Sequence, residues 1–312
     1  MTFFWLLTDF CNLNCKYCFY NIWIEKKNKD FDFFMIDKYI NFLEKTKTKK
    51  IILSWWEILR KDFYKKTIYI CKELEKKHII YNIDTNLVYL NSEIINFFKK
   101  TKYLNMLYIS LDSTNSITNN YLRWKTNKVL ENIKKLKKNW IKFSILLTLT
   151  KKNINDLSNT LKSLQKSETI VKPVFIPEKN KEYSKLMLDE SIDYDNLNKL
   201  LKKYINNTNL SKNLDKFYDL WTNYYNTKKI KKAIKSNINC PMWENFFVIF
   251  TDWIIKNCFH TDEIIGNILT NDYDHMIDKL KNKKYYTNLP KCFSKQCISL
   301  FSMNEFWNET IN

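Results

Sequence analysis

Glycine is almost absent from this sequence. Its 312 residues include one glycine and ten tryptophans, whereas average usage of about 7% would supply roughly 22 glycines. Turns and helix ends that require a positive φ therefore lack the residue that adopts it without strain. Either the backbone is strained at such places, or the functional protein carries glycine at some positions where this sequence shows another residue.

Long apolar runs are absent as well. No uninterrupted stretch reaches the 18 or more residues of a membrane-spanning helix, and no signal peptide opens the chain. With 45% hydrophobic residues, the composition is that of a soluble globular protein. We expect a cytoplasmic location and no membrane partner. Eight cysteines in that compartment favour metal or redox chemistry over disulfides.

The formal net charge of +19 raises the question of nucleic-acid binding. Lysine, asparagine and isoleucine are abundant together, as AT-rich codons would produce, and the lysines are spread along the chain rather than gathered in one stripe. We therefore do not expect nucleic acid as the main partner, although contact with RNA stays open.

Short apolar stretches alternate with amphipathic helical patterns along the first 175 residues. This alternation is typical of βα units and predicts an α/β fold with a parallel sheet. Six units are too few for a closed eight-stranded barrel. The expected strands are 3–8, 50–53, 79–83, 104–111, 141–149 and 169–175, and the expected helices are 35–47, 62–77, 92–100, 126–139 and 155–165.

Three cysteines follow the first expected strand at short spacing. Cys11, Cys15 and Cys18 form a Cys-x3-Cys-x2-Cys run on the loop after that strand. Three thiolates hold three irons of a four-iron cluster and leave the fourth iron open for chemistry. Zinc would need a fourth ligand, and none stands nearby in the sequence. Three buried free cysteines are the alternative.

This cysteine run, with Tyr17 before its third cysteine, resembles the signature loop of the radical S-adenosylmethionine (SAM) superfamily. The resemblance implies a partial (βα)6 TIM-like barrel and a [4Fe-4S] cluster whose open iron binds SAM. In that family, an electron from the cluster cleaves SAM to a 5′-deoxyadenosyl radical. Tyr17 would lie near the adenine.

The same resemblance nominates residues after the second strand. Trp55 and Trp56 stand where the family carries the two glycines of its Gly-Gly-Glu-Pro motif, and Glu57 stands at the glutamate. Glu57 would help to hold the SAM amino group, and glycines would allow close backbone approach. Ile58 replaces the usual proline.

Further cofactor contacts are implied at later strand ends. Ser110 and Asp112 match a strand end that meets the SAM ribose, and Arg123 resembles an arginine that pairs with the SAM carboxylate. Alternatively, Asp112 caps a turn and Arg123 forms a surface ion pair. Asn86 belongs to a segment that resembles Thr-Asn-Gly, with Leu87 at the glycine place.

Several tryptophans occupy places where glycine is expected. Trp253 lies between two apolar runs where an Asp-Gly hairpin turn is favoured, and Trp140 stands at the C′ position after a helical pattern. Trp124 stands where many family members carry Arg-Gly. We hypothesise that these residues, with Trp55 and Trp56, are glycines encoded by UGA. The alternative is a chain that is rich in genuine tryptophan.

A second cysteine set lies near the end of the chain. If Trp253 is glycine, the spacing Cys-x12-Gly-x4-Cys resembles the start of the SPASM and twitch extensions, which hold an auxiliary [4Fe-4S] cluster. Zinc is the alternative. The four cysteines are Cys240, Cys258, Cys292 and Cys297. The expected domains are a barrel at 1–180, a helical bridge at 181–236 and the auxiliary-cluster domain, a β-hairpin with a helix, at 237–312.

The resemblance therefore implies a radical SAM oxidoreductase or maturase that abstracts hydrogen from a substrate, above all a peptide or protein side chain. A reductant such as flavodoxin or ferredoxin would supply the electron. The chain starts almost at the cluster loop, without an N-terminal peptide-recognition domain, which weakens the peptide version. Cofactor or tetrapyrrole biosynthesis and RNA modification are alternatives. If the tryptophans are genuine, the alternative is a non-catalytic iron-sulfur binding or electron-transfer protein.

Overall fold

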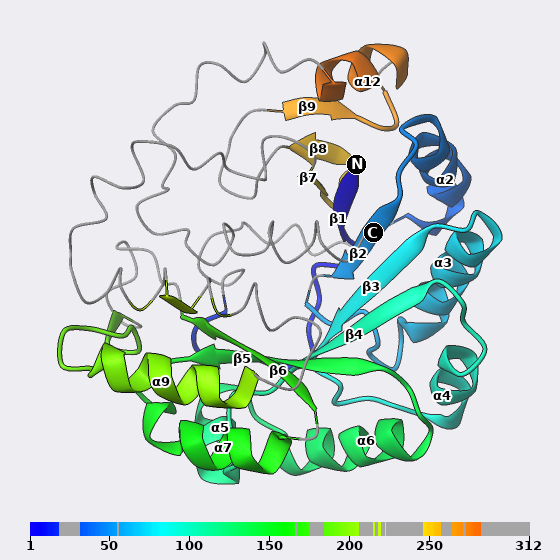
Figure 1. Cartoon of the computed structure of the whole chain (residues 1–312). Coiled ribbons are helices and arrows are strands. Elements are labelled where there is room, and N and C mark those ends of the chain that lie inside the picture. Colours follow the sequence, from blue (N-terminus) through cyan, green and yellow to red (C-terminus); the bar gives the residue numbers. More distant parts are fainter. Residues whose placement is uncertain are drawn as a thin grey trace.

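The computed structural model describes most of the first 205 residues and parts of the rest. The described residues are 1–18, 32–54, 56–165, 167–174, 184–205, 215, 218–219, 222, 246–256, 264–270 and 273–281. Figure 1 shows a curved sheet with helices along its outer rim.

Six parallel strands form the first part of the sheet. Strands β1 to β6 lie side by side in chain order, and each neighbouring pair is parallel. Helices connect successive strands, so the predicted partial (βα)6 barrel is confirmed. The strands are β1 (Thr2–Leu6), β2 (Lys50–Ser54), β3 (Ile80–Thr85), β4 (Leu104–Ser110), β5 (Phe143–Leu149) and β6 (Glu168–Pro173).

The connecting helices match the expected segments, with ends shifted by one or two residues in most cases. A short α5 was not expected, because its seven residues, polar in the main, carry too little apolar periodicity; the Asn115 side chain caps it by accepting from Ile117 N at 2.9 Å. The helices are η1 (Phe33–Met35), α2 (Ile36–Lys45), α3 (Tyr64–Lys76), α4 (Ser92–Phe98), α5 (Ser116–Leu122), α6 (Thr126–Lys138), η2 (Ile154–Asp156), α7 (Leu157–Leu164), α9 (Tyr194–Ile205) and α12 (Tyr273–Lys281).

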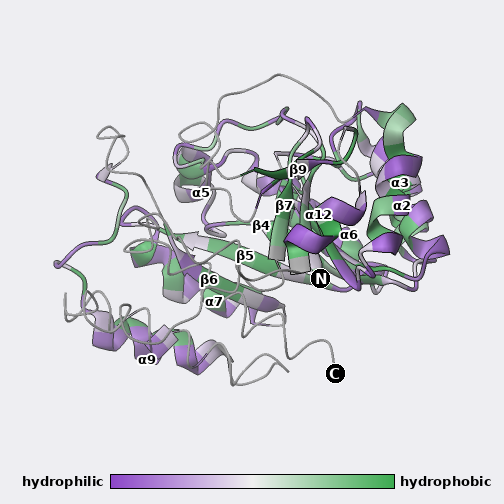
Figure 2. Ribbon diagram, turned by 90° about the horizontal axis from the view of Figure 1, so that it is seen from above, coloured by the Kyte–Doolittle hydropathy of each residue, from purple (hydrophilic) through white to green (hydrophobic). Residues whose placement is uncertain are grey.

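The main core lies between the outer face of the sheet and the helices. Side chains alternate between the two faces of a strand, and in β1 the outward-facing Phe3 and Trp5 are fully buried. The Trp5 ring stacks on Tyr39 of α2, and the Phe3 ring meets Phe42 edge to face. Figure 2 shows hydrophobic colour along much of the strands and both hydrophobic and hydrophilic colour along α9. A second apolar cluster, which includes Phe4, Leu6 and Ile52, lies on the inner face of the sheet.

The predicted C-terminal hairpin and helix are present, and the hairpin extends the barrel sheet. Strand β7 (Phe246–Ile249) pairs in parallel with β1, and β8 (Ile254–Lys256) and β9 (Ile264–Asn267) follow in antiparallel order. Helix α12 comes next in the chain. The boundaries of the three expected domains stay a prediction. Among the described residues, no helix has both the length and the apolar character that crossing a bilayer requires.

Candidate functional site

The three clustered cysteines lie on the loop that leaves the C-terminal end of β1. Cys18 N donates to the carbonyl of Cys15 at 3.1 Å, which closes the last turn of the loop. Lys16 N donates to the carbonyl of Leu122 at 3.1 Å and ties the loop to the end of α5. The loop is thus anchored at the edge of the barrel where parallel α/β folds place their chemistry.

The sulfur atoms receive weak hydrogen bonds from neighbouring groups. Cys11 Sγ accepts from Leu13 N at 3.4 Å and from Asn86 Nδ2 at 3.7 Å, and Arg123 Nη1 lies 3.9 Å from Cys15 Sγ. Burial raises the pKa of Cys11 to about 12 and that of Cys15 to about 11, the latter against the opposing charge of Arg123. Bound iron would therefore displace protons from these thiols.

The donor set fits an iron-sulfur cluster. Soft thiolates on one loop, with donors aimed at two sulfurs, are the usual environment of such clusters. Within the described ranges, no three His, Cys, Asp or Glu side chains gather as closely as a single metal ion would require. A four-iron cluster distributes its cysteine ligands over separate irons.

Glu57 joins the ends of two strands. Its fully buried carboxylate accepts from Leu59 N at 2.8 Å, from Thr85 Oγ1 at 2.7 Å and from Asn86 N at 2.6 Å. Burial raises the pKa of Glu57 to about 7 despite these three donors. Through Asn86, Glu57 also fixes a side chain that reaches Cys11. Its predicted contact with the SAM amino group stays a prediction.

Asp112 connects three elements behind the cysteine loop. Its Oδ2 accepts from the Tyr17 hydroxyl and from Arg123 Nε at 2.8 Å, and its Oδ1 accepts from Thr148 N at 3.0 Å. The Arg123 side chain is 14% exposed and that of Asp112 is fully buried. Arg123 therefore makes an ion pair, but a buried one rather than the surface pair considered from the sequence. The predicted SAM contacts of Tyr17, Asp112 and Arg123 stay predictions.

The sequence reasoning missed Arg60. Arg60 Nη1 donates to Thr8 Oγ1 at 2.6 Å, and the same oxygen accepts from Phe10 N at 3.1 Å. The guanidinium also lies over the Phe10 and Phe63 rings and pairs with Asp62. Arg60 thereby holds the entry of the cysteine loop. An arginine three residues after Glu57 was the available signal.

A row of polar side chains crosses the inner face of the sheet. Asp84, Tyr108, Ser144 and Glu168 are register partners on neighbouring strands from β3 to β6. Ser54 Oγ on β2 donates to Asp84 Oδ2 at 2.8 Å, and Ser144 Oγ donates to Glu168. Barrel interiors that are filled by packing carry bulky apolar residues instead.

Charge also lies on this inner face. Burial raises the pKa of Asp84 to about 6, against the effects of the Ser54 hydroxyl and of Lys172 on β6. Burial lowers the pKa of Lys172, and the nearby Asp84 opposes that change. The sequence analysis did not single out either residue. The available signal was a charged side chain within each of two strands, Asp84 in β3 and Lys172 in β6.

The remaining predicted residues divide into two groups. Ser110 ends β4 and is half-buried. Trp56 is half-buried, and its ring packs against a cluster that includes Phe4, Leu6 and Ile52 on the inner face. The predicted residues that lie outside the described residues are Trp55, Cys240, Cys258, Cys292 and Cys297.

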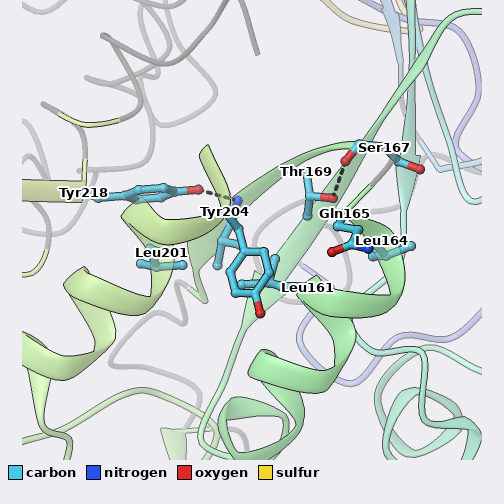
Figure 3. A pocket seen from close by; sticks show the side chains of 9 residues that line it. Leu161, Leu164, Gln165, Ser167, Thr169, Leu201, Tyr204 and Tyr218 are labelled. Atoms are coloured by element: carbon cyan, nitrogen blue, oxygen red, sulfur yellow. Dashed lines mark hydrogen bonds between the residues drawn. The ribbon is translucent and has the colours of Figure 1, made fainter. Parts of the chain in front are cut away.

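A small pocket lies on the other side of the sheet. It is formed between β6, α7 and α9, and its walls include Leu161, Thr169 and Leu201 (Figure 3). The Tyr218 hydroxyl accepts a hydrogen bond from Val171 N at 3.0 Å at its rim. None of its lining residues belongs to the cysteine loop or to the inner polar row. The pocket is therefore separate from the candidate site.

A protein-family model matches this chain. The model describes the radical SAM superfamily, and it covers residues 5–164, which include the cysteine loop, Glu57, Asp112 and Arg123. The chain belongs to the radical SAM superfamily. The predicted family, enzyme class and main cofactors, a [4Fe-4S] cluster and SAM, are thereby confirmed. When bound, these cofactors supply the electron and the 5′-deoxyadenosyl radical.

This chain is also similar in sequence to an individual curated protein. A cysteine-type anaerobic sulfatase-maturating enzyme of Clostridium novyi (strain NT) is 27% identical over 173 residues, which are 51% of this chain and 46% of that protein. The chain thus spans about half the length of this relative.

Two solved structures share the fold. The structure of anSMEcpe with bound AdoMet has a TM-score of 0.64 at 17% identity and covers 95% of this chain and 88% of its own. Streptococcus suis SuiB bound to precursor peptide SuiA has a TM-score of 0.65 at 14% identity, with 93% and 66% covered.

Proposed function

We propose that this radical SAM enzyme reductively cleaves SAM and abstracts a hydrogen atom from a peptide or protein side chain. The observation that carries the proposal is a set of hydrogen bonds at one end of the barrel. Asn86 and Arg123 contact the sulfur atoms of the cysteine loop, and Glu57 holds Asn86. These residues position the thiolates at the C-terminal ends of the parallel strands. Asp84 of the inner polar row lies near the end of β3, two residues before Asn86.

A peptide substrate is supported by the inner face and by the relatives. Peptide groups are polar and need hydrogen-bonding partners, which the row from Ser54 to Glu168 offers. The curated relative is named a sulfatase-maturating enzyme, and two solved neighbours contain the Cp18Cys and SuiA peptides. Abstraction from a small molecule of cofactor biosynthesis, or from RNA, is the alternative substrate class.

The C-terminal cysteines belong to the same proposal. Cys240, Cys258, Cys292 and Cys297 would hold an auxiliary [4Fe-4S] cluster that exchanges electrons, because four thiolates leave no open iron. A reductant such as flavodoxin or ferredoxin and a cytoplasmic location are further parts of the proposal.

The test is anaerobic reconstitution of the cluster, chemical reduction and measurement of 5′-deoxyadenosine formed from SAM. We expect product from a chain that carries Gly at positions 55, 56, 124, 140 and 253 and keeps the cysteine loop intact. The same chain should give none when Cys11, Cys15 and Cys18 are also changed to Ser. Cys71→Ala is the matched control, because Cys71 is buried in α3 away from the loop. If the glycine-carrying chain holds iron and sulfide but makes no 5′-deoxyadenosine, the enzymatic proposal is overturned in favour of an electron-transfer protein.

The substrate class needs a second measurement. Isotope from a peptide deuterated at one side chain should appear in 5′-deoxyadenosine when that peptide is the substrate. Candidate peptides would be those encoded beside the gene, with scrambled peptides as controls. Deuterium transfer from a tetrapyrrole precursor or an RNA, and from no peptide, would contradict the peptide proposal.

A further inference from the structure

Tryptophan is the most frequent non-glycine residue at positive φ in the described ranges, and positive φ is a conformation that glycine adopts readily. Eight non-glycine residues in the described ranges have a positive φ, and half of them are tryptophans. Five tryptophans lie in those ranges, and only Trp5, within β1, has ordinary strand geometry. A bulky residue at positive φ is a genuine outlier. The four are Trp56 (35°), Trp124 (74°), Trp140 (57°) and Trp253 (71°).

Trp140 occupies a helix-terminating position. Trp140 N donates to the Lys137 carbonyl and Ile141 N donates to the Leu136 carbonyl, both at 3.1 Å, after the end of α6. This pair of bonds is the Schellman motif, whose left-handed residue is usually glycine. The Trp140 side chain is 95% exposed, so no packing compensates for the strain.

Trp253 occupies a hairpin position with the same requirement. Phe250 N donates to the Ile254 carbonyl at 3.0 Å, and Trp253 N donates to the Phe250 carbonyl at 2.9 Å. The connection is a three-residue loop rather than the simple Asp-Gly turn expected from the sequence. Such loops end on a residue in the left-handed region, where glycine is preferred.

Trp124 and Trp56 are close to the candidate site. Trp124 follows α5, where its N donates to the Asn119 carbonyl at 3.2 Å, and its side chain is 56% exposed. Trp56 precedes Glu57, and its ring packs on the inner-face cluster. An indole at this position occupies space that a glycine, having no side chain, would leave free next to Glu57. Position 56 therefore fits the cofactor poorly as tryptophan and well as glycine.

Strain alone does not explain the pattern. The other four residues at positive φ comprise two lysines, one histidine and one leucine, so the fold tolerates this conformation in several residue types. Those residues are Lys47, His78, Leu87 and Lys125. Among the five tryptophans in the described ranges, however, four have a positive φ. Because the pattern is concentrated in one residue type, we look for its cause in the translation of that residue's codon rather than in the fold.

We infer that glycine occupies positions 56, 124, 140 and 253 of the functional protein, through UGA codons that its translation reads as glycine. The same reading extends to Trp55, which adjoins Trp56. The inference does not depend on the proposed peptide substrate, because it follows from backbone geometry. It makes the Gly-Gly-Glu segment at positions 55–57 complete.

The decisive test is mass spectrometry of tryptic peptides from the protein purified from its source cells, together with the nucleotide sequence of the gene. Peptides 51–60 and 139–142 contain positions 55, 56 and 140. We expect glycine in both peptides and UGA at all five codons. Tryptophan in these peptides, or UGG codons, would overturn the inference.

A binding measurement separates the site positions from the remote one. The cluster-loaded chain carrying Trp55→Gly and Trp56→Gly should bind SAM at least tenfold more tightly than the chain as written. Trp140→Gly is the control, since position 140 precedes β5 at the opposite end of the barrel, and should leave SAM affinity unchanged. Equal affinity in all three chains would contradict the view that the Trp56 ring obstructs the cofactor.

Discussion

Arg123 and Asp112 form a buried ion pair behind the cysteine loop, with Arg123 Nε 2.8 Å from Asp112 Oδ2. The same carboxylate accepts hydrogen bonds from Tyr17 on the loop and from Thr148 N in β5. One side chain thus links the cysteine loop, the end of α5 and the sheet. The pair makes the geometry of the loop depend on distant parts of the chain.

Asp112→Asn should therefore destabilise the protein strongly. Removing one partner of a buried ion pair leaves the other charge uncompensated, and we expect a loss of about 3 to 5 kcal/mol in the free energy of unfolding. Urea unfolding under anaerobic conditions measures it. The double change of Asp112 to Asn and Arg123 to Gln should cost less than the sum of the single changes. Asp62→Asn, at an exposed partner of Arg60, is the control and should cost about 1 kcal/mol or less.

Glu57 should be more important for stability than its position in a cofactor motif implies. Glu57→Ala removes the acceptor for Thr85 Oγ1 and for two backbone N–H groups in a dry interior. Each such group costs about 1 to 3 kcal/mol when left without a partner, so we expect a total loss of about 3 to 5 kcal/mol. Glu57→Gln keeps one acceptor oxygen and should cost about half as much. Denaturant titration compares the two, and equal losses would argue against the hydrogen-bond explanation.

Asp84 should make stability depend on pH. Its pKa rises on folding from 3.8 to about 6, so the folded protein binds the proton more tightly than the unfolded chain. The contribution of Asp84 to stability therefore falls as pH rises through the interval between those two values, and it stays low above pH 6. Relative to Asp84→Asn, the unmodified chain should lose about 1 kcal/mol between about pH 5 and about pH 8.

Thermal unfolding of both chains across this pH range tests the Asp84 prediction. The groups that act on the carboxyl are Ser54 and Lys172, so Ser54→Ala should steepen the dependence by removing a donor to the charged form. A pH dependence that is the same in Asp84→Asn as in the unmodified chain would show that another group titrates.

Trp140→Gly should stabilise the protein although it removes a large side chain. A left-handed conformation costs a non-glycine residue about 1 to 2 kcal/mol, and the exposed ring contributes little packing. The melting temperature should rise, whereas Trp140→Ala should change it far less. Trp5→Gly is the opposite control: this ring is buried and stacked on Tyr39, and its loss should cost about 3 to 5 kcal/mol.

Local patterns in the sequence predicted much of the fold. The strand starts at Lys50 and Leu104, and the helix starts at Ser92 and Thr126, lie where the apolar periodicity placed them. Periodicity works there because each element buries one face against the same core. The short helix α5 was not predicted, because the Asn115 cap and the neighbouring elements stabilise it more than an apolar stripe does.

The candidate site was predicted in its residues but not in its connections. The spacing of Cys11, Cys15 and Cys18 identified the loop, since ligand spacing is a local property. The contact of Asn86 with Cys11, and the inner charges of Asp84 and Lys172, join strands that are far apart in the chain. No single-sequence pattern records which strands become neighbours or how they tilt.

The sequence by itself determined the cysteine loop, the βα alternation and the misfit of tryptophan with glycine positions, because spacing, periodicity and turn chemistry act over a few residues. Tertiary structure alone decided that Asp112 pairs with Arg123, that Glu57 serves two strand ends, and that β7 extends the barrel beside β1. Those relationships depend on long-range packing, in which burial sets the partners of each polar group.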